Sequence, residues 1–248
     1  MTPPVVLAIA ATDSGGAAGL AADLTTLAAL GVHGACVVTA VTAQDTEAVR
    51  RVHRVPVDHV AAQLDAVLDD LPVAAVKTGM LADPAIVRLV ARRCAHLPIV
   101  VDPVLRATTG AELASDAVVA AYRSHLLPVA TVATPNAAEA AVLGDAARTV
   151  LVTGSERGVD VLSRAGQPDV TFAHAAVRTR NDHGTGCTFS SAIAAYLAHG
   201  HPLVEAIDHA GHFVLKQLNL SQTWNLGRGR GPIAHLAPDS STTPGGVR

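Results

Sequence analysis

The segment Asn181–Thr188 reads NDHGTGCT and leads directly into the apolar run Phe189–Leu197. A glycine-rich turn that opens a helix leaves several backbone N–H groups without partners, beside the positive end of the helix dipole. Such a turn can bind phosphate or the developing negative charge of an oxyanion. Cys187 lies at the same helix start, where we expect the dipole to lower the pKa of the thiol toward neutrality. An anion site and a potential base or nucleophile are therefore predicted within four residues.

Simpler interpretations of the same segment exist. Gly-x-Gly turns precede many helices, and lone cysteines in soluble chains are often buried packing residues. The segment is not a P-loop, because no Gly-Lys-Ser/Thr follows, and it is not a dinucleotide fingerprint, because only one Gly-x-Gly is present. The elements that position these residues must decide between the interpretations.

Apolar runs of strand length alternate with helical patterns along the chain. The predicted strands are Val5–Ala10, Ala35–Val41, Val73–Lys77, Pro98–Val101, Thr131–Ala133 and Thr149–Val152. The predicted helices are Ala17–Leu30, Val57–Leu71, Pro84–Cys94, a short one from Asn136, Gly186–His199 and Leu203–Leu218. Continuous apolar strands joined by helices predict an α/β protein with a parallel sheet covered on both faces.

Length and composition limit the function classes. The 248 residues suit one α/β domain, which we place over residues 1–237, followed by a disordered tail over 238–248. A net charge of −3 without a basic stripe argues against nucleic-acid binding. The first apolar run is too short for a signal peptide or a membrane helix, and three widely separated cysteines disfavour disulfides. We therefore expect a cytoplasmic protein without membrane contact.

Polar and glycine-containing segments follow each predicted strand. In order along the chain, the candidate residues in these segments are Asp13, Gln44, Met80, Asp102, Val104, Asn136, Glu139 and Thr153. In open α/β sheets, ligands bind beyond the carboxyl ends of the strands, so these segments predict a shared cleft. Taken singly, Asp13 and Asn136 are equally well explained as helix N-caps.

Seven segments in a fixed order carry a family resemblance over Val5 to about Leu236. They are TDSGGAAGLAADL, VVTAVTAQDT, KTGML, VVDPV, TPNAAEA, HGTGCTFSSAIAA and GRGRGPIAH. In this order they closely resemble the hydroxymethylpyrimidine and hydroxymethylpyrimidine-phosphate kinases of thiamin synthesis, within the ribokinase superfamily. The resemblance implies a three-layer α/β/α ribokinase-like fold with a mostly parallel sheet, a homodimer, and phosphoryl transfer from ATP with Mg²⁺ to a small pyrimidine.

The resemblance also implies roles for the candidate residues. Cys187 matches the family's general base, and the amides of Gly184, Thr185, Gly186 and Cys187 would stabilise the transferring phosphoryl group.

The remaining roles concern the pyrimidine, the metal and the nucleotide. Gln44 matches the pyrimidine-recognition residue, because an amide offers both a donor and an acceptor. Asp13, Met80 and Val104 match other substrate-pocket positions. Asn136 and Glu139 resemble the element that organises Mg²⁺, and Thr153 falls at the nucleotide. Asp102 is either a further metal or phosphate-side residue or a turn cap.

The sequence departs from the family pattern at four points. Ala11 stands where the family commonly has Gly, Ala21 where it has Gln, and Thr153 where a Lys reaches the nucleotide phosphates. The family's helix between Leu143 and Thr149 is missing, although a parallel crossover needs a dozen or more residues. A trimmed nucleotide half is therefore expected. Arg228 or Arg230 could supply the missing charge, or could simply be solvated.

Three functions remain open at this stage. The first is a hydroxymethylpyrimidine kinase. The second is a pyridoxal kinase of the same fold, because both substrates are flat heteroaromatic rings with a hydroxymethyl group. The third is a pyrimidine-binding homologue that has lost phosphoryl transfer, for which Thr153 and the missing helix argue. The intact HGTGC segment argues against the third, because a binding protein needs no oxyanion turn beside a thiol.

Overall fold

The computed structural model describes residues 2–107, 110–154 and 158–235. Within them the main sheet has eight strands in the order β10-β9-β8-β7-β6-β5-β1-β2. The parallel strands are β1 (Val5–Ala10), β2 (His33–Val38), β5 (Val73–Thr78), β6 (Ile99–Val101), β7 (Val132–Ala133) and β8 (Thr149–Val152). Two antiparallel strands, β9 (Val159–Arg164) and β10 (Val170–Ala173), complete one edge. The predicted α/β class with a mostly parallel sheet is confirmed.

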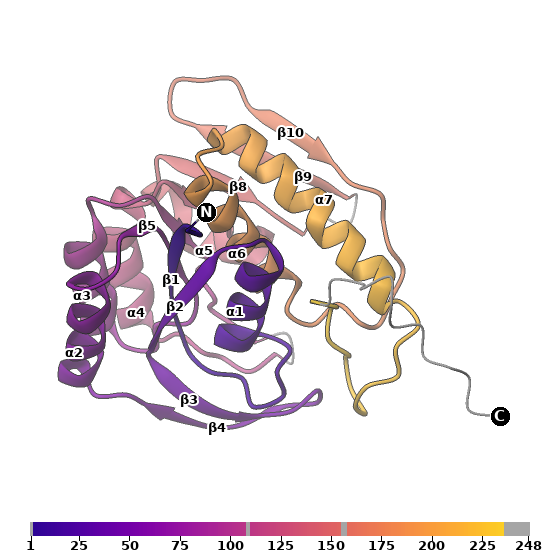
Figure 1. Ribbon diagram of the computed structural model, residues 1–248, viewed down its shortest axis with the longest axis horizontal. Coiled ribbons are helices and arrows are strands. Elements are labelled where there is room, and N and C mark those ends of the chain that lie inside the picture. The colour runs from indigo at the N-terminus through magenta and orange to yellow at the C-terminus, as the bar shows by residue number, and fades with distance from the viewer. Residues whose placement is uncertain (1, 108–109, 155–157, 236–248) are drawn as a thin grey trace.

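Helices cover both faces of this sheet (Figure 1). One face carries α2 (Val57–Leu68), α3 (Pro84–Cys94) and α4 (Asp116–Ala121), and the other carries α1 (Gly19–Ala29), α6 (Thr185–Ala198) and α7 (Leu203–Ser221). Along β1, Leu7 and Ile9 belong to the hydrophobic core on the side of α2, α3 and α4. Val6 belongs to the core on the side of α1, α6 and α7. The strands β1, β6 and β7 are buried along their whole length, which explains their continuous apolar sequences.

The predicted second strand divides into two at Thr39. Its N-terminal half is β2, and the rest is β3 (Ala40–Gln44), which leaves the main sheet and pairs with β4 (Val49–Arg54) in a separate two-stranded sheet. The Thr39 amide donates to the Ala10 carbonyl and its hydroxyl donates to the Met80 carbonyl, at 2.6 Å. This buried hydroxyl fixes the point at which the chain turns away over the strand ends.

The short connection between β7 and β8 is completed by α5 (Ala137–Leu143). This helix and the 3-10 turn Gly144–Ala146 carry the chain through residues 134–148, and Ala133 pairs with Val150 in parallel. The chain therefore closes the crossover with α5 itself, and the helix expected after Leu143 is not needed to keep the strand parallel.

Several elements were not predicted: β4, β9, β10 and α4. All but one residue of β4 is exposed and three of its six residues are arginines, so it lacks an apolar run. The expected tail over 238–248 lies outside the described residues. Among the residues that are described, no helix is both long and apolar enough to span a membrane.

Candidate active site

All of the predicted site residues line a single cleft of about 420 Å³ at the carboxyl ends of the parallel strands. They are Asp13, Gln44, Met80, Asp102, Val104, Asn136, Glu139, Thr153, Gly184, Thr185, Gly186 and Cys187. The volume lies in the range of small-molecule sites. The segments at the carboxyl ends of the strands therefore meet in one cleft, although some of their residues are 174 positions apart in the sequence (187 − 13).

The glycine turn before α6 is built by a close backbone approach. Gly184 has a φ of 88°, and a Cβ there would lie 1.8 Å from the carbonyl oxygen of Ala17. Gly19 has a φ of 55°, and its Cβ would lie 2.4 Å from the carbonyl oxygen of Ala11. Only glycine fits at these two positions, because a side chain would both clash and strain the backbone. The turn and the loop after β1 are thus locked together.

The first turn of α6 presents the predicted anion-binding amides, with one correction. The Thr185 amide already donates to the Asp182 carbonyl, at 3.2 Å, and is not available to a ligand. The amides of Gly184, Gly186 and Cys187 have no hydrogen-bond partner within the described part of the chain. These three N–H groups at a helix start can bind an anion.

The predicted lowering of the Cys187 pKa is wrong. Burial is the main cause that raises the pKa of this thiol to about 12; Lys77 opposes the shift, and the nearby Asp102 and Asp23 contribute to it. Desolvation of a thiolate outweighs the helix dipole here, because Cys187 lines the cleft beside two buried carboxylates. Cys187 is therefore a neutral thiol in the ligand-free protein.

A buried ion pair beneath the cleft was not assigned a role from the sequence. The Lys77 Nζ lies 2.6 Å from the Asp23 Oδ1 and 3.8 Å from the Asp102 Oδ2, and both Lys77 and Asp23 are fully buried. The Ser191 hydroxyl from α6 donates to the same Asp23 oxygen, at 2.8 Å. Burial alone would lower the Lys77 pKa, but Asp23, Cys187 and Asp102 raise it above its usual range. The sequence did offer one sign of this ion pair, because Lys77 is the one charged residue in the largely apolar strand β5.

One end of the cleft is held by Asp13, Gln44 and His183. Asp13 accepts hydrogen bonds from the amides of Gly15, Ala17 and Ala18, so it fixes the loop that precedes α1. The Gln44 amide nitrogen lies 3.1 Å from the His183 Nε2, and burial lowers the pKa of that imidazole. A neutral imidazole accepts this hydrogen bond, so His183 orients the Gln44 amide toward the cleft.

An apolar wall faces these polar groups. Met80, Ala11, Ala40 and Ala82 form a small buried cluster, against which Val104 and Leu113 pack. The wall gives a flat ring an apolar surface. We refer to this part of the cleft, with Asp13, Gln44 and His183, as the acceptor end.

Asn136 and Glu139 form a helix-capping box at the start of α5. The Asn136 side chain accepts from the Glu139 amide, and Glu139 accepts from the amides of Asn136 and Leu105. Burial and the neighbouring Asp102 raise the Glu139 pKa to about 7, and burial also raises that of Asp102. Asn136 therefore caps the helix, as one interpretation predicted, and also lines the cleft, as the other predicted. The buried carboxylates of Glu139 and Asp102 each make it less favourable for the other to be charged.

The opposite part of the cleft, which we call the nucleotide end, is formed by Thr153, Gly154, Asp160 and His174 together with the inner face of α7. Asp160 accepts from the Gly154 amide, at 3.2 Å, and lies 3.2 Å from the His174 Nε2. Neither Asp160 nor His174 was predicted, because β9 and β10 were not. Arg106 lines the same cleft and is exposed.

The two arginines considered as replacement charges lie elsewhere. Arg228 pairs with Glu47 at 3.0 Å, and Arg230 pairs with Asp182. Neither lines the cleft. Their loop is fastened to the β3–β4 turn, where the Gly229 amide donates to the Thr46 hydroxyl. Both arginines are therefore engaged in ion pairs outside the cleft lining and do not replace the charge absent at Thr153.

A three-layer α/β fold with a glycine anion turn at the strand ends defines a small-molecule kinase of the ribokinase type. The profile of the phosphomethylpyrimidine kinase family matches residues 13–149 and 144–234, and these two segments meet at the shortened connection. The hydroxymethylpyrimidine/phosphomethylpyrimidine kinase of Synechococcus elongatus is 43% identical over 264 residues, covering 96% of this chain and 99% of that protein. The chain therefore belongs to the phosphomethylpyrimidine kinase family.

Solved structures agree with this fold. An ADP complex of Bacillus subtilis pyridoxal kinase superposes with a TM-score of 0.84 at 32% identity, covering 94% of this chain and 98% of that one. The phosphomethylpyrimidine kinase of Clostridium difficile superposes with a TM-score of 0.74 at 30% identity, covering 86% and 98%. The predicted ribokinase-like fold is confirmed.

Proposed function

We propose that this protein transfers the ATP γ-phosphoryl group to the hydroxymethyl group of 4-amino-5-hydroxymethyl-2-methylpyrimidine and then to its monophosphate. The observation that carries the proposal is the joint position of the free α6 amides, Cys187 and the acceptor end within one cleft. The family membership supports the same reaction. We place the reaction in the cytoplasm, where ATP is supplied, and assign it to a single domain over residues 1–237.

At the acceptor end, the pyrimidine ring lies against Met80 and Val104, and Gln44 binds its edge. One amide hydrogen of Gln44 is engaged by His183, which leaves the other hydrogen and the carbonyl oxygen for the ring nitrogen and the amino group. Asp13 contributes by holding the loop beside the ring. The pocket thus selects a flat ring with an adjacent donor and acceptor.

Phosphoryl transfer uses the start of α6. The amides of Gly184, Gly186 and Cys187 bind the oxygens of the transferring group while the hydroxymethyl oxygen attacks the γ-phosphorus and ADP leaves, and the Cys187 thiolate accepts the hydroxymethyl proton. Because Cys187 is a neutral thiol in the ligand-free protein, it must first lose its own proton to solvent, and positive charge in the site favours that loss. Lys77 supplies part of this charge from below.

Asp102, Glu139 and Asn136 fit a site for Mg²⁺ bound partly through water. Burial raises the pKa of both Asp102 and Glu139, and Lys77 offsets this only at Asp102, so a bound cation would stabilise the charged form of the pair. Both Glu139 oxygens already accept amide hydrogens, which favours contact through water over direct coordination. When bound, Mg²⁺ neutralises charge on the ATP phosphates.

The homodimer is proposed to form through the outer face of the β3–β4 sheet. On this face Val41 is 50% exposed and lies beside exposed Ala43, Arg51 and His53. An exposed apolar residue on a projecting sheet favours contact with a second copy. Sedimentation of the protein and of Val41→Lys tests this, because the variant should be monomeric at concentrations where the parent is dimeric.

Pyridoxal kinase is the second candidate, and the TM-score of 0.84 with the Bacillus subtilis pyridoxal kinase favours it. The deciding experiment measures ADP release from ATP and Mg²⁺ with hydroxymethylpyrimidine, its monophosphate or pyridoxal. Turnover of both pyrimidines with much weaker turnover of pyridoxal supports the proposal. Turnover of pyridoxal alone assigns the second candidate. Pyrimidine binding without any turnover would mean that the protein has lost phosphoryl transfer, as the missing lysine at Thr153 would explain.

A further inference from the structure

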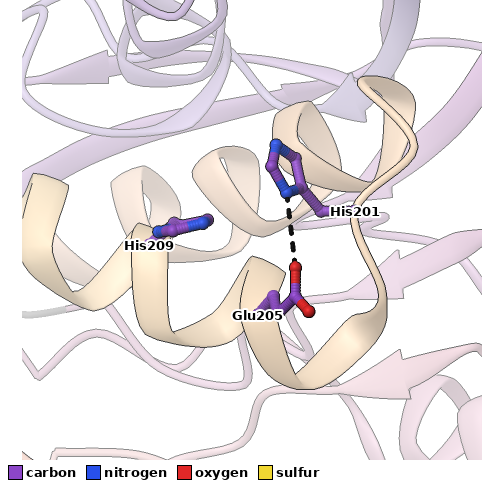
Figure 2. A group of neighbouring side chains, drawn as sticks. All are labelled: His201, Glu205 and His209. Atoms are coloured by element: carbon purple, nitrogen blue, oxygen red, sulfur yellow. Dashed lines mark ion pairs between the residues drawn. The ribbon is translucent and has the colours of Figure 1, made fainter.

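Three potential metal ligands converge on the outside of the molecule, where α6 turns into α7. His201 lies in the connecting loop, and Glu205 and His209 lie on the first turns of α7 (Figure 2). The ligand atoms of these three side chains all lie within 4.8 Å of one another. Within the described part of the chain, no other group of this kind is found. None of the three lines the cleft.

We infer that His201, Glu205 and His209 form a binding site for a divalent transition metal of the Zn²⁺ class, separate from the catalytic cleft. Two imidazole nitrogens and one carboxylate oxygen are a ligand set that Zn²⁺ accepts, with a fourth position open to water. The same set is poor for Mg²⁺, which prefers oxygen ligands in an octahedral arrangement. The site is therefore expected to discriminate between the two ions.

The geometry is close to that of a bound ion. Ligand atoms of a tetrahedral Zn²⁺ lie roughly 3.3 Å apart, given bonds of about 2.0–2.2 Å. The His201 Nδ1 lies 3.7 Å from the Glu205 Oε2. The three side chains are partly or fully exposed, so small rotations bring their atoms to bonding distance without moving the backbone.

An aromatic side chain from the neighbouring helix holds the two imidazoles together. The Tyr196 ring on α6 contacts His201 edge-on, with centroids 5.6 Å apart, and contacts His209 at 5.2 Å. The two imidazoles are themselves 5.1 Å apart and nearly perpendicular. The His201 amide also donates to the Tyr196 carbonyl, which fixes the loop. The alternative interpretation is that His201 and Glu205 form an ordinary surface ion pair. That pair alone does not account for His209, whose imidazole is held beside the same two side chains.

A metal at this position would connect the loop after α6 to the first turns of α7. Further along, α7 carries Gly211, Val214, Leu215 and Leu218 to the nucleotide end of the cleft. The inferred role is therefore structural: the ion fixes the beginning of the helix that covers the nucleotide end. Binding to the folded chain and not to the unfolded chain stabilises the fold by an amount that grows with the logarithm of the free metal concentration above the Kd.

The experiment measures Zn²⁺ binding by equilibrium dialysis with saturating Mg²⁺ present, together with the thermal midpoint. We expect about one Zn²⁺ per chain that excess Mg²⁺ does not displace, and a midpoint raised by several degrees. His209→Ala should weaken binding at least about tenfold and remove the shift in midpoint. His212→Ala is the matched control, because His212 is an exposed histidine on the same helix that lies outside the group.

Two results would overturn the inference. One is binding of Zn²⁺ that is equal in the parent protein, His209→Ala and His212→Ala, which would place the ion elsewhere. The other is no saturable binding to the parent protein. Glu205→Gln is the second test variant, because it retains the shape of an exposed side chain while removing the carboxylate, and it should also weaken binding. The metal-free midpoints of all variants establish that each is folded.

Discussion

The two ends of the cleft are built on different physical bases. At the acceptor end, Asp13 and Met80 follow the central parallel strands β1 and β5, and a fully buried ion pair, Lys77–Asp23, lies beneath the cleft. At the nucleotide end, Thr153 and Gly154 follow a strand near the sheet edge, and the antiparallel β9 and β10 with α7 complete the wall. The buried charges of Lys77, Asp23 and Asp102 thus lie below the proposed reacting groups. Where the nucleotide is proposed to bind, the charged or titratable side chains are those of the Asp160–His174 pair.

This difference indicates which step of the proposed reaction depends most on charges that the folded protein already holds in place. The proton and the transferring phosphoryl group need positioned charge at the moment of reaction, which a buried network supplies without rearrangement. A nucleotide bound as proposed would bring its own charge and metal, so this end needs less fixed charge of its own, and the exposed Arg106 lines the same cleft. Substitutions in the two ends should therefore differ in kind as well as in size.

The largest effect is expected from Cys187→Ala. Removing the proposed base should lower kcat about 10²–10⁴-fold, with little change in the KM for the pyrimidine. Steady-state ADP release measures both constants. The exposed Cys36 provides the matched control, since Cys36→Ala removes a thiol outside the cleft. If Cys187→Ala retained activity to within about twofold, the thiol would not be the base.

The parent enzyme's pH profile tests the same thiol. Because the Cys187 pKa is raised to about 12 in the free protein, the thiolate fraction grows with pH. The value of kcat/KM should therefore rise with pH above neutrality, and this limb should vanish in the residual activity of Cys187→Ala.

The next largest effect is expected from Lys77→Met, which leaves Asp23 buried without its partner. We expect a loss of about 3–5 kcal/mol in the free energy of unfolding, measured by urea denaturation. The double variant Asp23→Asn/Lys77→Met removes both charges and should recover most of that stability, yet remain poorly active. Equal destabilisation of the single and double variants would contradict a charge origin.

A smaller effect concerns Glu139 and Mg²⁺. The Glu139 pKa is raised from 4.5 to about 7 in the folded protein, so the folded state binds more protons than the unfolded state between these values. The free energy of unfolding should therefore fall as pH rises through this window, by about 2 kcal/mol from this residue. Urea denaturation at about pH 5 and pH 8 measures the difference.

Two further measurements test whether Glu139 and Asp102 cause this pH dependence of the free energy of unfolding. Mg²⁺ should restore stability at about pH 8 and have little effect at about pH 5, where Glu139 is protonated. Glu139→Gln should flatten the slope, although it also removes one acceptor for a backbone amide. An unchanged slope in this variant would assign the pH dependence to other groups.

The sequence predicted the acceptor end better than the nucleotide end, for physical reasons. A strand buried on both faces carries a continuous apolar run, so β1 was predicted with its observed bounds and β5 to within one residue, and Asp13 and Met80, which follow these strands, line the cleft. The exposed β4 and the edge strands β9 and β10 lack such runs. The Cys187 pKa was mispredicted because a local rule, the helix dipole, was overridden by burial that only the tertiary structure determines.

The smallest expected effect tests the missing cation at position 153 directly. Thr153→Lys adds a cation beside Asn136, where the cleft otherwise presents a hydroxyl that is only partly buried. A flexible ammonium near ATP phosphates should lower the KM for ATP about fivefold to tenfold, or about 1–1.4 kcal/mol, while the KM for the pyrimidine stays constant. Thr171→Lys adds the same charge on β10 outside the cleft and should change neither constant. If both variants lowered the KM for ATP equally, the gain would come from net charge, and the contrast between the two ends would lose its local meaning.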